Sequence, residues 1–327
     1  MKRRLLIAAA CIGASTAAGA APSAEAMVKM SRAVLKVSAL GDDDNLSVGS
    51  AVVIGPDSAL TNCHVTRHAR IIVLSRGLAR HAVVGQRADV SRDLCLLRTA
   101  ERLPYPAVEL RPTRTLTLGE RVLAHGYSGG MEAHFARGLI VDLHSAGGSH
   151  VIQTSAGFLQ GASGGGLFDE EGRLIGITTF LTSAGRTEYF AMPADWTDRL
   201  RERAEEAPKP LPGSALWAQL PAHQPWFMRL LEPLSRKDWP TVAQMADEWM
   251  EAEPHAPAAA LMCARAARAL ARPARMSQCL QQALDGARDS EIELTRIAAW
   301  ARSEGLDEAV AASTTALARL RPLPRGD

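Results

Sequence analysis

The sequence predicts a multidomain protein in which an all-β half is followed by an all-α half built from helical hairpins. From Val28 to about Trp196, short β-branched and apolar runs alternate with Gly, Asp, Asn and Pro turn signals. After Gly213, the chain is rich in Ala, Leu, Arg and Glu at helical spacing. The total length of 327 residues is sufficient for two domains.

The first 26 residues have the pattern of a secretory signal peptide. A basic start at residues 2–4 precedes a short apolar run, and residues 24–26 (Ala-Glu-Ala) form a small-x-small cleavage site. Residues 18–20 (Ala-Gly-Ala) offer a second possible cut. The apolar run is too short to span a bilayer. We therefore expect residues 1–26 to be removed and the protein to be periplasmic or secreted, with no membrane span.

The charge balance excludes partners that are recognised by electrostatics alone. The chain has 37 Lys and Arg against 35 Asp and Glu, and residues 1–26 hold three of the former and one of the latter, so 34 of each remain. A neutral chain gives no electrostatic basis for binding nucleic acid or an anionic membrane. No metal-ligand cluster or nucleotide-binding loop is apparent, so we expect no metal and no cofactor.

Four cysteines follow the expected signal segment: Cys63, Cys95, Cys263 and Cys279. An even number in an oxidising compartment favours disulfides, and four cysteines allow three pairings. Pairing within each half, Cys63–Cys95 and Cys263–Cys279, is the most economical. The alternative is that all four are small buried hydrophobic residues.

The β half contains many short strands and no long amphipathic helix. Strands are expected at 33–37, 50–54, 71–74, 121–124, 138–141, 150–153 and 173–177. This pattern indicates a sandwich or a barrel, and about 170 residues suffice for two small barrels packed together. We assign residues 27–200 to this domain.

A Pro-rich linker over residues 201–215 is expected to be stiff and solvated. In residues 216–327, segments 241–254, 275–288 and 309–322 align at a period of 34 residues. This is the length of a tetratricopeptide unit, which is one helix hairpin. Most signature aromatic and glycine positions of that repeat are missing, so we predict a tetratricopeptide-like helical domain.

Three ordered segments carry candidate groups for nucleophilic catalysis: 61–65 (Thr-Asn-Cys-His-Val), 93–97 (Asp-Leu-Cys-Leu-Leu) and 161–165 (Gly-Ala-Ser-Gly-Gly). A serine hydroxyl needs a base with a pKa near neutrality, and the base needs a buried carboxylate to fix its tautomer. His64 is the candidate base, Asp93 the orienting acid and Ser163 the nucleophile. The N–H groups of Gly161 and Ser163 are the candidate oxyanion hole.

Two other assignments fit part of this pattern. Asp89 is the nearest competitor of Asp93, but no apolar strand follows it directly. Residues 161–165 also fit the G-x-S-x-G elbow of α/β-hydrolases. That elbow must open a helix and must precede its acid and base, whereas 164–168 lead toward a turn and the later histidines lie in the helical half. The esterase fold is therefore disfavoured.

These segments resemble the trypsin-like protease domain of the Deg/HtrA family. The resemblance extends to 50–55, 118–127, 152–165, 174–179 and 189–193, and spans roughly residues 33–195. It implies a double β-barrel with His64, Asp93 and Ser163 as a catalytic triad in the cleft between the barrels. The chain departs from the family in having no evident PDZ domain, and in residues 159–160 (Leu-Gln) and Gly166 beside the nucleophile, where the family has Asn-Pro and Pro.

The expected primary pocket is neutral. Gly157 lies six residues before the nucleophile, which is the floor of this pocket in the trypsin-like fold. With Thr178, Thr179 and Phe180 on the adjoining strand, the sequence predicts binding of small or medium apolar side chains. That strand is also expected to pair its backbone with an extended substrate.

The sequence therefore predicts an exported serine endopeptidase that acts on protein or peptide substrates, with helical repeats that offer a surface for a protein partner. The alternative hypothesis is an inactive or conditionally active barrel that serves as a binding module, with the repeats as its interaction surface.

Overall fold

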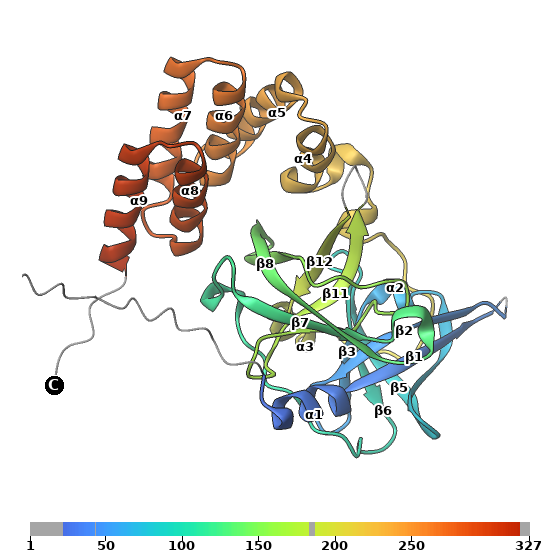
Figure 1. Cartoon of the computed structure of the whole chain (residues 1–327). Helices are drawn as coiled ribbons and strands as arrows, with labels where there is room; N and C mark the ends of the chain where they lie inside the picture. The colour runs from blue at the N-terminus through green and yellow to red at the C-terminus, as the bar shows by residue number, and fades with distance from the viewer. Residues whose placement is uncertain (1–21, 43, 183–186, 321–327) are drawn as a thin grey trace, which may run out of the picture.

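The β half forms two closed barrels of six strands each, and a row of helices follows them (Figure 1). The computed structural model describes residues 22–42, 44–182 and 187–320. The predicted double barrel and the predicted helical hairpins are both confirmed.

The first barrel is antiparallel throughout, with the strand order β1-β2-β3-β6-β5-β4. Its interior is filled by alternate apolar residues such as Leu35, Val53 and Leu97, which are fully buried. A short helix, α2 (Cys63–Thr66), follows β3 directly. The strands are β1 (Val34–Gly41), β2 (Leu46–Val53), β3 (Ser58–Thr61), β4 (Ala69–Arg76), β5 (Ala79–Asp89) and β6 (Leu94–Thr99).

The second barrel has the strand order β10-β11-β12-β9-β8-β7 and is also antiparallel. The 3-10 helices η1 (Thr113–Thr115) and η2 (Ser128–Gly130) flank β7. The strands are β7 (Arg121–Gly126), β8 (His134–Ala146), β9 (Ser149–Thr154), β10 (Gly166–Phe168), β11 (Leu174–Thr182) and β12 (Glu188–Pro193). A cluster with fully buried Phe168 and Phe190 joins the two barrels.

Helix α1 (Ala24–Ala33) precedes the first barrel, and its side chains Met30 and Ala33 are fully buried. Ser23 caps this helix, because its Oγ accepts a hydrogen bond from the N–H of Ala26. Residues 24–26, the expected end of the signal segment, therefore form the first turn of a packed helix. Residues 1–21 lie outside the described residues.

The connector after α3 (Trp196–Arg201) is not the wholly solvated linker that we expected. Leu211 is buried against the Cys63–Cys95 pair, which is disulfide-bonded. Glu206 pairs with Gln86 of β5 through two backbone hydrogen bonds. Proline prevents helix formation here but does not prevent burial, so the segment lies along the first barrel. Two 3-10 turns follow, η3 (Leu216–Ala218) and η4 (Pro221–His223).

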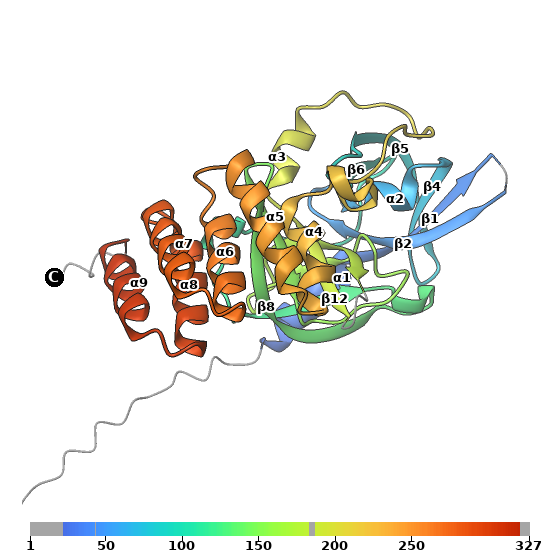
Figure 2. The same ribbon diagram turned by 90° about the horizontal axis from the view of Figure 1, so that it is seen from above.

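The helical half keeps the period read from the sequence. Helices α5, α7 and α9 begin at residues 239, 273 and 307, 34 residues apart. Figure 2 shows the helices in a row, with α9 farthest from the barrels. The Cys263–Cys279 disulfide joins α6 to α7. The helices are α4 (Trp226–Ser235), α5 (Trp239–Ala252), α6 (Pro257–Ala269), α7 (Pro273–Gly286), α8 (Glu291–Ser303) and α9 (Asp307–Leu320). Within the described ranges, no helix is long and apolar enough to cross a membrane.

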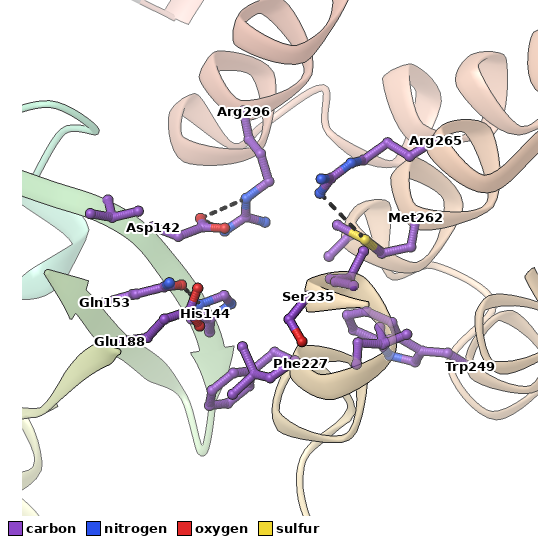
Figure 3. Close-up of a pocket in the computed structure, with 15 residues that line it drawn as sticks. Asp142, His144, Gln153, Glu188, Phe227, Ser235, Trp249, Met262, Arg265 and Arg296 are labelled. Carbon is purple, nitrogen blue, oxygen red and sulfur yellow. Dashed lines mark hydrogen bonds and ion pairs between the residues drawn. The ribbon is translucent and has the colours of Figure 1, made fainter. Parts of the chain in front are cut away.

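Helix α8 contacts the second barrel. Arg296 donates to the carboxylate of Asp142 on β8, with Nε 2.9 Å from Oδ1, as Figure 3 shows. The same guanidinium binds Glu293, one turn earlier on α8. Ile292 packs into the apolar core of the barrel. The helices are thus joined to the β half by a buried charge network and by apolar packing.

Candidate active site

His64 and Asp93 are brought together by α2 and by the turn that precedes β6. The backbone N–H of His64 donates to Asp93 Oδ1 at 2.8 Å, and His64 Nδ1 lies 2.6 Å from Oδ2. The His64 side chain is 26% exposed, whereas that of Asp93 is 1% exposed. This arrangement places a buried carboxylate behind a reachable imidazole, which fixes the ring and leaves Nε2 available.

Asp93 has a φ of 56°, which is the left-handed region that Asp and Asn tolerate best among residues with a side chain. Its N–H donates to the Val90 carbonyl, which closes the turn between β5 and β6. Asp89, the competing acid, instead binds Arg92 and Arg203. The turn therefore directs the carboxylate of Asp93 to His64, whereas the carboxylate of Asp89 binds two arginines.

Ser163 lies in a loop of the second barrel that is held by hydrogen bonds. Its Oγ donates to the carbonyl of Thr179 at 3.3 Å. Its carbonyl accepts from the N–H of Ser50 in the first barrel at 2.8 Å. Gly164 follows with a φ of 85°, and a Cβ there would lie 2.0 Å from the Ser50 carbonyl oxygen, so only glycine fits.

The two amides predicted as the oxyanion hole have no acceptor among the described residues. Within the described residues, neither the Gly161 N–H nor the Ser163 N–H donates a hydrogen bond. Gly161 has a φ of 94°, a conformation that is costly for residues with a side chain. The preceding carbonyl, of Gln160, accepts from the N–H of Gly129. Backbone N–H groups without a protein acceptor can stabilise a developing negative charge where both point toward it.

Of the residues expected to bind substrate, Gly157 is covered by another side chain, and the threonine side chains of β11 are buried. Gly157 is covered by Tyr189, because a Cβ at Gly157 would lie 3.2 Å from the Tyr189 hydroxyl. The side chains of Thr178 and Thr179 are buried, and Thr178 Oγ1 donates to the carbonyl of Ala162 at 2.7 Å. The Thr178 side chain thus holds the loop that carries Ser163, the candidate nucleophile.

Phe180 is buried as well, and its ring stacks on that of Phe190 with centroids 4.7 Å apart. On another side it stacks on Trp217, a residue of η3 in the connector. Sequence reasoning did not identify Trp217 or Tyr189. Tyr189 lies opposite Thr154 of β9, a pairing that appears only in the folded barrel, and no local pattern points to Trp217.

A second histidine near Ser163 is not a base candidate. His125 of β7 is 2% exposed and stacks on Phe135 with centroids 3.8 Å apart. Burial lowers the pKa of His125 from 6.5 to about 4. The ring is therefore neutral at physiological pH and is enclosed by the barrel.

A cavity of ≈ 510 Å³ between the second barrel and the helices is a separate candidate (Figure 3). Two of its titratable side chains have polar partners within the lining: Asp142 binds Arg296, and His144 lies 2.9 Å from Gln153. The His144 ring also stacks on Phe227, and burial lowers its pKa. The contacts around the cavity therefore hold the helices against the second barrel. In the part of the chain that is described, no group of three or more His, Cys, Asp or Glu could hold a metal ion.

The chain is similar to known proteases across its β half. The trypsin-like peptidase domain family matches residues 49–177. Serine protease HTR4 of Bos taurus is 33% identical over 225 residues, which are 63% of this chain and 45% of that protein. The probable periplasmic serine endoprotease DegP-like of Buchnera aphidicola is 28% identical over 170 residues, 48% of this chain and 35% of that protein.

Among solved structures, the HtrA-type protease AlgW with tripeptide aligns with a TM-score of 0.51 and 28% identity. The alignment covers 55% of this chain and 63% of that chain. This chain thus spans less than half the length of the two curated relatives. Family match, relatives and double barrel agree, and the β half of this chain is a trypsin-like peptidase domain of the Deg/HtrA type.

Proposed function

We propose that the chain is an exported serine endopeptidase that cleaves protein or peptide substrates through an acyl-enzyme on Ser163. His64 Nε2 takes the proton of Ser163 Oγ as Oγ bonds to the scissile carbonyl carbon. The N–H groups of Gly161 and Ser163 bind the resulting oxyanion. The imidazolium then gives its proton to the leaving amine as the C–N bond breaks.

In the second half of the reaction, His64 takes a proton from water while the water oxygen attacks the acyl carbonyl. His64 then returns this proton to Ser163 Oγ as the ester bond between Oγ and the acyl carbon breaks, which releases the new carboxyl terminus. The observation that carries this proposal is the pair of hydrogen bonds from His64 to buried Asp93, with a loop serine and two unpaired amides on the facing barrel.

The hydroxyl of Ser163 donates to the carbonyl of Thr179. Catalytic hydrogen bonds are often loose or misaligned until substrate binds. A rotation about the Cα–Cβ bond of Ser163 changes the acceptor without moving the backbone, which is held by Ser50. The proposal therefore requires the hydroxyl of Ser163 to turn from the Thr179 carbonyl toward His64 when substrate binds.

Cleavage after small or medium apolar residues is supported by the surroundings of Gly157, because the described atoms nearest to a Cβ built there all belong to Tyr189, an uncharged side chain. Tyr189 limits the depth of this pocket. Export is supported by the two disulfides, which persist in oxidising compartments, and by the signal-like first 26 residues. We accordingly place the protein in the periplasm or outside the cell.

Labelling with a fluorophosphonate tests the proposed nucleophile. The wild-type chain is expected to react, Ser163→Ala to lose the label, and Ser145→Ala, an exposed serine on β8, to label as the wild type does. Heat-denatured protein should not react, because the hydroxyl is activated only in the folded site. Labelling that persists in Ser163→Ala would refute the assignment of the nucleophile.

The engagement of Ser163 Oγ with Thr179 favours one second candidate, a conditionally active barrel that serves as a binding module. This candidate predicts no labelling of the folded wild type, together with partner binding that survives Ser163→Ala. Labelling of the resting protein would exclude it.

A further inference from the structure

A residue from outside both barrels completes the hydrogen-bond shell of Asp93. The indole Nε1–H of Trp217 donates to Asp93 Oδ2 at 2.9 Å. Oδ2 is also the oxygen that binds His64 Nδ1, so imidazole and indole share one acceptor. With the backbone N–H of His64 on Oδ1, the buried carboxylate has three donors.

The Trp217 ring is fixed by two aromatic contacts in addition to this hydrogen bond. It meets the His64 ring edge-on, with centroids 5.4 Å apart and planes at 89°. It stacks on Phe180, with centroids 5.7 Å apart. Edge-on and offset-stacked rings are favourable geometries for aromatic pairs. The indole therefore lies between His64, the candidate base of the first barrel, and β11, the strand of the second barrel that is expected to pair with substrate.

The backbone around Trp217 is held on both sides. The N–H of Leu216 donates to the carbonyl of Ser91 at 2.9 Å, which ties η3 to the turn that carries Asp93. Gln224, just before α4, donates from its side chain to the Trp217 carbonyl at 3.0 Å. The position of the indole thus depends on the first barrel and on the segment that leads into the helices.

We infer that Trp217 is a positioning residue for the His64–Asp93 pair and a wall of the substrate site. The inference rests on the proposed function and deepens it. A hydrogen bond to an ionised carboxylate is stronger than one between neutral groups, and it restrains rotation of the carboxylate. The edge-on contact restrains the imidazole. A peptide paired along β11, with its scissile carbonyl at Ser163, passes Phe180 and so meets the indole stacked there.

Two substitutions separate these roles. Trp217→Phe removes the N–H donor and keeps an aromatic ring, whereas Trp217→Ala removes both. We expect Trp217→Phe to lower kcat roughly 10- to 100-fold, the effect of one hydrogen bond to a charged group, with KM little changed. It should also displace the acidic limb of the pH–rate profile. Trp217→Ala should in addition raise KM, because the wall is lost.

Trp239→Phe is the matched control, because Trp239 begins α5 in the helical half and is partly buried there. It should leave kcat, KM and the pH profile unchanged. The unfolding midpoint in urea, measured for each variant, shows whether the chain still folds. A Trp217→Phe enzyme with wild-type kcat and pH profile would overturn the inference.

An NMR measurement separates this inference from the proposed catalysis. In protein labelled with ¹⁵N-histidine, the ring N–H resonance of His64, assigned with His64→Gln, reports the bond to Asp93. We expect it to move in Trp217→Phe and not in Trp239→Phe. If it moves in a protein that lacks peptidase activity, the proposed function fails and the positioning role stands. If it does not move, the positioning role is wrong whatever the activity.

Discussion

Asn62 of the first barrel and Thr179 of the second are joined by a hydrogen bond of 2.9 Å from Nδ2 to Oγ1. The same amide donates to the carbonyl of Asp93, also at 2.9 Å. The carbonyl of Thr179 in turn accepts the hydroxyl of Ser163. One buried side chain therefore links the turn that carries the candidate acid to the strand that contacts the candidate nucleophile.

The energetic coupling of Asn62 and Thr179 can be measured with a double-mutant cycle. Asn62→Ala should lower the free energy of unfolding by about 1–3 kcal/mol, because it leaves buried groups without a donor. Thr179→Val removes the hydroxyl at similar volume. If the bond joins the barrels, the double mutant should lose less than the sum of the single losses in urea unfolding. Strictly additive losses would argue that the bond contributes nothing.

Asp93→Asn should abolish most of the reactivity of Ser163 while preserving the fold. Asn tolerates the left-handed conformation of this residue, so the turn is maintained. An amide supplies the wrong hydrogen-bond partner for His64 Nδ1, and the loss expected for this mechanism is about 10³-fold or more. The fluorophosphonate labelling rate measures it.

Asp89→Asn serves as the control for that experiment, since Asp89 precedes the same turn but binds Arg92 and Arg203. Its labelling rate should stay within a few fold of wild type. An Asp93→Asn protein that labelled as fast as Asp89→Asn would remove Asp93 from the proposed triad.

Much of this architecture could be predicted because its signals are local. The strands of the barrels follow from short β-rich runs between turn residues, and the helices from a 34-residue period that the structure keeps. The pairing of Cys63 with Cys95 was predicted because both cysteines lie in the β half, and the structure has that bond. The segments of His64, Asp93 and Ser163 were found because each is a short motif.

The contacts that were missed join distant parts of the chain. Trp217 lies 124 positions from Asp93, just past the Pro-rich segment 201–215 that we expected to be a solvated linker. Nothing in its neighbours indicates the partner, since the contact exists only after the connector folds back on the first barrel. Helix α1 was missed for another reason, because the small residues that suit a cleavage site are also good helix formers.

Tyr189→Ala should widen the primary pocket. The Tyr189 hydroxyl lies against Gly157, and its ring is tilted against Phe158 with centroids 5.1 Å apart. Removing the ring should shift the preferred residue before the cleaved bond from small to large apolar, as read from a peptide library. Tyr105→Ala, in the first barrel, should leave the preference unchanged. An unaltered profile in Tyr189→Ala would place the pocket elsewhere.

Helix α1 predicts which of the two possible signal cuts is used. A cut after Ala26 would remove the first turn and the Ser23 cap, whereas a cut after Ala20 leaves both. Since Met30 and Ala33 are buried, we expect the cut that keeps the helix intact. Intact-mass measurement of the exported protein should give a first residue of Ala21. A first residue of Met27 would contradict this expectation.

His125 should make the protein less stable as the pH falls below about 6.5. Its folded-state pKa is lowered to about 4 by burial, with Arg76 and His134 adding positive charge nearby. Between pH 6.5 and about 4, the unfolded chain binds a proton that the folded chain does not, so the free energy of unfolding falls as the pH falls, by about 3 kcal/mol over this interval. Above pH 6.5 neither state binds the proton and the effect vanishes.

His125→Asn tests this dependence, because its side-chain amide replaces the donor to the His134 carbonyl and does not titrate. Urea unfolding at pH 7.5, 6 and 5 should show a smaller loss of stability in His125→Asn than in the wild type. Exposed His68, changed to Asn, should keep the wild-type slope. Equal slopes in wild type and His125→Asn would mean that the buried ring is not the group that responds, and carboxylates would then have to account for the loss of stability in acid.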